Sequence, residues 1–397
     1  MLTATLLTLL NTAAAVPASA DLGVIAQVSS EVPESAAPHI KRLRLIPEAA
    51  IGQVRGRVHF DFARGVELIE AWVDAPVGEA RAKLGVQKIP FTWYRAASFR
   101  ELATADWSLT TTTFGAEHQL GLRFDGGGEH LQWATGLFAG TPTRVPHATE
   151  WARAHEFVPT QDWWRPHPEW VGRLSWVEGE EAAHQVFDTT GGKPRFAASL
   201  SAAVDFRPAA GRDFAARVAP ELRMLAHRTG WQLVAWMGSI PQNPEVRSLA
   251  GGLTTGAVGL DVTGTVVPHR YLHLSAHIGL LHRTDAYRGP LHRDELEAGF
   301  TAHVPLVKDQ LLITSELHHR QIVGVRSDIA LLLHAQVAVR TGRKNGHERP
   351  HPAGPEQPHH REAADAGAAE APATASRLQG LPTLDHTTSP RTLLALH

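Results

Sequence analysis

Residues 54–62 read Val-Arg-Gly-Arg-Val-His-Phe-Asp-Phe, and the character of their side chains changes at every step. The apolar or glycine positions share one face of an extended chain: Val54, Gly56, Val58, Phe60 and Phe62. The charged and polar positions share the other: Arg55, Arg57, His59 and Asp61. A period of two with one face free of polar side chains is typical of a β-strand. The stretch therefore predicts a strand that separates an apolar environment from a polar one.

The same pattern recurs on both sides of this stretch. Further two-faced segments begin near residues 69, 80, 119, 196, 271, 295 and 329. They run to roughly 9–13 residues, close to the ~9–11 that a tilted strand needs to cross a bilayer and longer than the usual ~5–6 of a globular strand. About fifteen such segments lie between Ile40 and Arg340, and bacterial barrels have even strand numbers. We therefore predict an all-β fold, a transmembrane antiparallel β-barrel of sixteen strands, with fourteen as the alternative.

A soluble β protein is the competing interpretation, because a sandwich also alternates polar and apolar side chains. The segments here are longer and more numerous than one sandwich holds. Their polar faces are also rich in Gly, Ser, Thr, His and Arg, which suit a water-filled lumen. The pattern favours the membrane barrel.

Composition removes several classes of function. The 397 residues carry 38 Lys and Arg against 40 Asp and Glu, so the basic excess of a nucleic-acid-binding protein is missing. The chain has no cysteine, which excludes thiolate metal sites, thiol nucleophiles and disulfides. Metalloprotease, phosphate-loop and serine-hydrolase motifs do not occur in the sequence. We expect no enzymatic activity and no cofactor.

The first twenty residues are typical of a signal peptide. An apolar run from Leu6 to Val16 is too short to span a bilayer, and Ala18-Ser19-Ala20 gives a small-residue cleavage pattern before Asp21. We predict a signal peptide over 1–20, a periplasmic linker over 21–39 and the barrel over 40–340.

Residues 341–397 lose the strand period and become rich in Pro, His, Ala, Glu and Gly, which predicts a disordered low-complexity tail. Four tail histidines have no rigid spacing that indicates a metal site: His347, His351, His359 and His360. On the strand near residue 318, His318 and His319 point to opposite faces, which favours one lumen and one lipid-side residue over a pair of metal ligands.

Two stretches interrupt the strand rhythm, residues 90–117 and 139–168. Long connections in a compact barrel are usually functional or disordered. The second contains Trp163 and Trp164, which we interpret as an aromatic anchor at the membrane interface. A carbohydrate-stacking platform is the alternative for this pair.

The run Lys83–Phe91, Lys-Leu-Gly-Val-Gln-Lys-Ile-Pro-Phe, resembles the Gly-Gln-x-Lys-x-Pro-Phe motif at a strand end of the phosphate-selective porin O/P family. Segments 98–101, Phe114 and 120–122 fill the places that follow it in that family. The resemblance extends over about residues 40–340 and is densest over 40–140. It implies an outer-membrane porin that forms a homotrimer. It also implies that residues 90–117 fold into the lumen and place Arg95 and Arg100 at a constriction.

The first predicted strands carry more basic than acidic side chains on their lumen faces. Arg guanidinium groups match phosphate and carboxylate oxygens, and basic side chains in a pore select anions. The candidate pore-lining and anion-binding residues are Arg42, Arg44, Arg55, Arg57, Arg81, Lys83, Arg95, Arg100 and Arg123. Fewer acidic residues accompany them: Asp61, Glu70, Asp74 and Asp125. Acidic residues on later strands offer neutralisation as the alternative: Asp205, Asp261, Glu295, Glu297 and Glu316.

The sequence thus predicts passive diffusion of small hydrophilic solutes across the bacterial outer membrane, with anions such as phosphate preferred. Two other functions stay open at this point. One is an outer-membrane barrel enzyme of lipase type, which needs a Ser–His pair aligned on one outer face. The other is a secreted carbohydrate-binding β protein built around the Trp-rich stretch.

Overall fold

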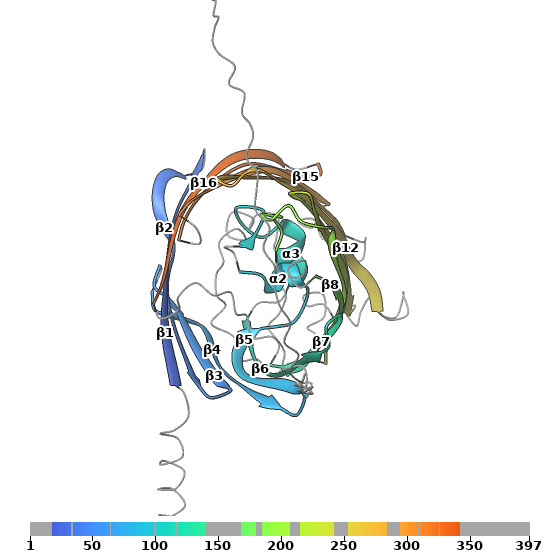
Figure 1. The fold of residues 1–397 in the computed structure, drawn as a ribbon. Helices are drawn as coiled ribbons and strands as arrows, with labels where there is room; N and C mark the ends of the chain where they lie inside the picture. Colours follow the sequence, from blue (N-terminus) through green and yellow to red (C-terminus); the bar gives the residue numbers. More distant parts are fainter. Residues whose placement is uncertain are drawn as a thin grey trace, which may run out of the picture. The chain divides into compact units, whose positions relative to one another are not determined.

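A computed structural model describes the chain over residues 18–32, 35–63, 65–98, 101–115, 118–139, 168–179, 185–206, 215–241, 253–283, 294–307, 310–324 and 326–341. The strands in it form a closed antiparallel barrel of sixteen (Figure 1), which confirms the predicted fold and strand number. Within the described residues, no helix is long and apolar enough to cross a membrane.

The strands follow one another around the barrel in chain order. Their bounds are β1 (Ala18–Val32), β2 (Ser35–Ile51), β3 (Val54–Asp61), β4 (Glu67–Val77), β5 (Ala80–Lys88), β6 (His118–Gly127), β7 (Leu131–Phe138), β8 (Glu169–Glu178), β9 (Arg195–Asp205), β10 (Ala216–Ala226), β11 (Thr229–Pro241), β12 (Leu253–His269), β13 (Leu272–Arg283), β14 (Glu295–Val307), β15 (Leu311–Ile322) and β16 (Arg326–Thr341). β1 closes the ring against β16, with Ile25 opposite Ala338. A closed ladder leaves no strand edge, so the backbone polar groups of the wall are satisfied without water.

The outer surface of the barrel is apolar and its inner surface is polar. On β3, Val54 is 43% exposed, whereas Asp61 on the opposite face is 7% exposed. Later strands repeat this: Leu317 and Ile329 are exposed, while Glu316 and Gln336 are buried. An apolar outer band around a polar interior is the surface of a membrane-spanning barrel.

The two ends of the barrel differ in the length of their connections. One end, which we call the short-turn end, holds the start of β1, the end of β16 and the turns 52–53, 78–79, 227–228 and 270–271. Positive φ angles at His227 (51°) and Arg228 (66°) close one of these turns, as in a type I′ hairpin. The opposite end, the long-loop end, holds the connections 89–117 and 139–168. In bacterial barrels short turns face the periplasm and longer loops face the exterior.

The linker predicted over residues 21–39 is wrong, because the described residues of this range, 21–32 and 35–39, belong to β1 and β2. Leu22, Val24 and Val28 are exposed on the outer face of β1, and Gln27 and Ser29 are buried on the inner face. The alternation was present in the sequence, but the interspersed small and polar residues concealed it. The barrel therefore runs from Ala18 to Thr341 rather than from 40 to 340.

The signal peptide and the tail stay predictions, because residues 1–17 and 342–397 lie outside the described residues. Cleavage after Ala20 is compatible with barrel closure. Residues 18–20 pair only with 49–51 of β2, whereas the pairing of β1 with β16 begins at Leu22.

Candidate functional site

The connection between β5 and β6 enters the barrel. We call residues 89–115 the inward loop; within it lie α2 (Trp93–Ala96) and α3 (Leu109–Phe114), with residues 99–100 outside the described part. Figure 1 shows both helices inside the ring of strands. The loop position implied by the porin resemblance is therefore confirmed for the described residues of this segment.

Hydroxyl side chains begin both helices. The Thr92 side chain accepts a hydrogen bond from the backbone N–H of Arg95, and the Ser108 side chain accepts one from Thr111. Such caps satisfy backbone donors at a helix start and make short helices possible in a buried loop. These local contacts explain why a stretch without strand period folds into two short turns of helix.

Carboxylates of the far wall hold the inward loop through its backbone and hydroxyl donors. Four strands contribute one each, in the pairs Trp93 N to Glu221 (2.7 Å), Ser108 Oγ to Asp261 (3.0 Å), Leu109 N to Glu297 (2.7 Å) and Ala105 N to Glu316 (2.6 Å). Hydrogen bonds to an ionised acceptor are stronger than neutral ones. Since buried backbone N–H groups need partners, this row of carboxylates fixes where the loop lies in the lumen.

Asp106 ties the inward loop to the opposite side, at β2. Its carboxylate lies 2.7 Å from Lys41 Nζ and 3.5 Å from Arg42 Nη2, and all three side chains are largely buried. Burial opposes ionisation of Asp106, but the two cations overcome it and hold the pKa of that carboxyl below its usual value.

A β-bulge explains how two consecutive residues reach one carboxylate. Gln27 of β1 pairs with Arg42 and Val28 pairs with Ile40, so Lys41 is an extra residue in β2. Adjacent strand side chains normally point to opposite faces, and a bulge re-aims one of them. The bulge therefore directs both Lys41 and Arg42 to the loop.

An aromatic cluster packs the inward loop against β11. Trp236 of β11 lies 5.9 Å from Phe91 and 5.8 Å from Phe114, measured between ring centroids, and both phenylalanines are fully buried. A Cβ atom on Gly259 of β12 would lie 3.0 Å from the Phe114 ring, so the glycine makes room for it. The lumen thus contains a small apolar core beneath the inward loop, and this packing holds the loop rigidly in place.

Seven of the nine predicted basic residues lie on one sector of the barrel wall, on β2, β3, β5 and β6, and carboxylates accompany most of them. Arg95 is on α2, with its guanidinium 4.9 Å from the centre of the Trp107 ring, and Arg100 lies outside the described residues. The ion pairs of the sector are Arg42 with Asp106, Arg44 with Asp61, Arg55 and Arg81 with Asp74, Arg57 with Glu48, and Arg123 with Asp125. Lys83 Nζ lies 4.4 Å from the centre of the Trp72 ring.

Accessible charge in this sector lies near the short-turn end. The side chains of Arg55 and Arg81 are 35% and 26% exposed, whereas that of Arg42 is 2% exposed. Arg81 also donates to the backbone carbonyl of Gln53 in the 52–53 turn, at 2.9 Å. The basic residues that solutes can reach are therefore at the mouth of the barrel.

Sequence reasoning missed a second set of arginines on the far wall. Arg217 of β10 donates to Glu169 and, at 2.7 Å, to the carbonyl of Phe114. The others pair in the same way: Arg223 with Glu221, and Arg283 and Arg320 with Glu295. The alternation of residues 216–226 could have predicted them, because Arg217, Glu221 and Arg223 fall on one face of that segment.

A second segment reaches inward from the short-turn end, between β8 and β9. Asp188 is fully buried and accepts hydrogen bonds from Arg228 N (2.8 Å) and Arg195 Nη2 (2.5 Å). The Phe187 ring lies 5.1 Å from His273 and 5.3 Å from His303, between centroids, and His303 Nε2 lies 3.0 Å from the carbonyl of Ala103 in the inward loop. The inward loop and the segment between β8 and β9 therefore meet at β14. The sequence does not indicate that the segment between β8 and β9 turns inward, because it has no strand period.

Comparison with known proteins supports the fold. No protein-family model matches the chain, and no curated protein matches it. The solved outer-membrane channel DcaP of Acinetobacter baumannii has a TM-score of 0.51 at 13% identity, over 82% of this chain and 98% of that chain. The anion-selective porin from Comamonas acidovorans has a TM-score of 0.51 at 10% identity, over 81% of this chain and 100% of that chain.

These likenesses show that the chain has the fold of bacterial outer-membrane porins and channels. Its apolar outer band is the kind of surface that such barrels present to lipid. The narrower resemblance to phosphate-selective porins stays a prediction.

Proposed function

We propose that the protein is a passive channel for small hydrophilic solutes, with a modest preference for anions such as phosphate. The observation that supports it is a closed barrel whose lumen is lined by polar side chains and narrowed by a loop held on both sides. Fixed obstructions of this kind set a size limit without any chemical step. The homotrimer implied by the porin resemblance is part of the same proposal.

The case for anions rests on the mouth at the short-turn end. Arg55 and Arg81 share Asp74, so one carboxylate faces two guanidinium groups. Lys83 lies against the Trp72 ring beside them. Forked guanidinium donors fit phosphate oxygens, and a lumen partly shielded from bulk water focuses their field on entering anions. Ion pairs elsewhere in the lumen reduce the effect, which is why we propose a preference rather than strict selection.

Reversal potentials under a KCl gradient test this preference. We expect a potential of the sign for chloride over potassium in the wild type, and a smaller one after Arg55→Ala or Arg81→Ala because each change removes a mouth cation. Arg270→Ala is the control for loss of a cation at the same end of the barrel, since Arg270 is exposed in the 270–271 turn and does not belong to a strand of the wall. Equal potentials in all four proteins would leave a general diffusion pore and remove the anion proposal.

A further inference from the structure

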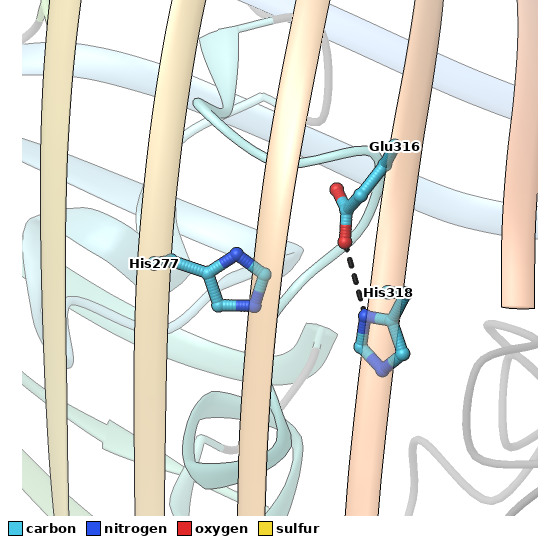
Figure 2. A group of neighbouring side chains, drawn as sticks. All are labelled: His277, Glu316 and His318. Atoms are coloured by element: carbon cyan, nitrogen blue, oxygen red, sulfur yellow. Dashed lines mark hydrogen bonds and ion pairs between the residues drawn. The ribbon is translucent and has the colours of Figure 1, made fainter. Parts of the chain in front are cut away.

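Three neighbouring strands bring two histidines and a glutamate together in the lumen wall. In the register of β13, β14 and β15, His277 lies opposite Gly299, and Gly299 lies opposite His318. Glu316 precedes His318 by one strand repeat, so both side chains point inward. Figure 2 shows the His277 ring turned across the middle strand toward Glu316 and His318. His318 is therefore on the lumen side, as predicted, while His319 bonds Ser327 on the other face.

Gly299 keeps the space between these side chains open. A Cβ atom at this position would lie 2.2 Å from His277 Cε1, 2.6 Å from His277 Nδ1 and 3.0 Å from Glu316 Oε1. Any other residue would therefore displace the His277 ring. The glycine forms the floor of a small cradle whose rim is made of nitrogen and oxygen atoms.

The Nδ1 atom of His277 lies at this cradle and, within the described part of the chain, makes no contact that stabilises the wall. Its Nε2 lies 3.0 Å from Glu297 Oε1, whereas Nδ1 is buried and has no hydrogen-bond partner among the residues that the structure describes. In its neutral form, a histidine that donates Nε2–H to a carboxylate carries its lone pair on Nδ1. This carboxylate–histidine arrangement is the one that orients histidine ligands in metal sites.

We propose that His277, Glu316 and His318 bind one divalent transition-metal ion of the zinc class. One nitrogen or oxygen atom from each residue lies within 4.8 Å of those of the others. The Glu316 Oε1 to His318 Nδ1 distance is 3.0 Å, near the ~3.3 Å between two ligand atoms of a tetrahedral zinc ion. Two imidazoles and a carboxylate suit Zn²⁺, Ni²⁺ or Cu²⁺ rather than Ca²⁺ or Mg²⁺.

Binding of the metal ion releases protons from the ligand atoms. The proton shared between His318 Nδ1 and Glu316 Oε1, and the proton that Nδ1 of a cationic His277 carries, leave to solvent when these atoms become ligands. The second oxygen of Glu316 stays held by Thr301 Oγ1 at 2.9 Å and by Ala105 N of the inward loop at 2.6 Å. Glu297, behind His277, likewise accepts from Leu109 N of the loop. The ion would thus sit where the wall anchors the obstruction, with a fourth position open to water.

Titration of the refolded full-length protein with Co²⁺, followed by Zn²⁺ competition, tests the site. We expect one tight equivalent with a visible d–d band of tetrahedral type in the wild type. His277→Ala and Glu316→Gln should weaken that equivalent by roughly 100-fold or more, beyond the 10–100-fold that loss of an outer-shell partner costs. Glu297→Gln should fall within that outer-shell range.

Two further variants separate the site from effects of folding and from the neighbouring histidine. Gly299→Ala removes no ligand but fills the cradle, so it should also abolish the tight equivalent, while far-ultraviolet circular dichroism shows an intact barrel. His319→Ala removes the neighbouring outward histidine and should bind as the wild type does. Tight binding that survives in His277→Ala, Glu316→Gln and Gly299→Ala, or a wild type without a tight equivalent, would overturn the proposal.

Discussion

Replacement of residues 93–114 by a short Gly-Ser linker is expected to raise the single-channel conductance by roughly twofold or more, because ion flow depends on the narrowest cross-section. The described part of this segment lies inside the barrel and buries Phe114 and most of its neighbours against the lumen wall. Its removal leaves Glu221, Asp261, Glu297 and Glu316 to water, which can solvate them. Planar-bilayer recordings of the two proteins at the same salt concentration measure the change.

Deletion of residues 356–397 provides the control for this experiment. The described strands close the barrel by Thr341, so the conductance should stay at the wild-type value. A linker variant that folds, as judged by its circular dichroism, and conducts no better than the wild type would show that the inward loop is not the constriction.

Asp106→Ala is expected to destabilise the barrel by about 3–5 kcal/mol, the range for removal of one partner from a buried ion pair. Lys41 and Arg42 would stay buried without their carboxylate. Urea unfolding of the refolded protein in detergent, followed by tryptophan fluorescence, measures the free energy of unfolding. Because the pKa of Asp106 is lowered, its stabilisation is present above the ordinary aspartate pKa of ~3.9 and is lost as the pH falls through the folded-state value.

Asp125→Ala is the matched comparison, since Asp125 also pairs with one arginine but is partly exposed. Its side chain is 31% exposed and that of Arg123 is 16% exposed. Exposed pairs contribute about 1 kcal/mol or less. Equal losses from the two alanine variants would contradict the anchoring role of Asp106.

The barrel could be predicted from the sequence because its strands are long and two-faced. The prediction failed where side chains are small or the ladder is irregular. Residues 22–32 alternate, but Gly23, Ile25 and Ser30 interrupt the contrast between the two faces. Ile69 follows the outward pattern of Val73, yet it is 2% exposed, because a bulge between His59 and Phe60 shifts the register there. A bulge is a feature of the pairing between two strands, so the alternation along a single strand does not reveal it.

The lumen position of the basic residues was predictable for the same reason, since alternation assigns faces. The roles of the acidic residues were not. Asp261, Glu297 and Glu316 looked like charges that neutralise the arginines, but they accept hydrogen bonds from the inward loop, more than 150 residues earlier in the chain. Such partners follow from the closure of the barrel. The cradle at Gly299 has the same origin, because its rim comes from two strands that flank a third.

The central claim is that water and small solutes cross this barrel, and planar-bilayer recording of the purified, refolded protein tests it most directly. The account predicts stepwise current increases of uniform size as single molecules insert, with a conductance that rises in proportion to KCl concentration. Protein that has the circular dichroism of a folded barrel and inserts into the bilayer, yet gives no current steps, would contradict it.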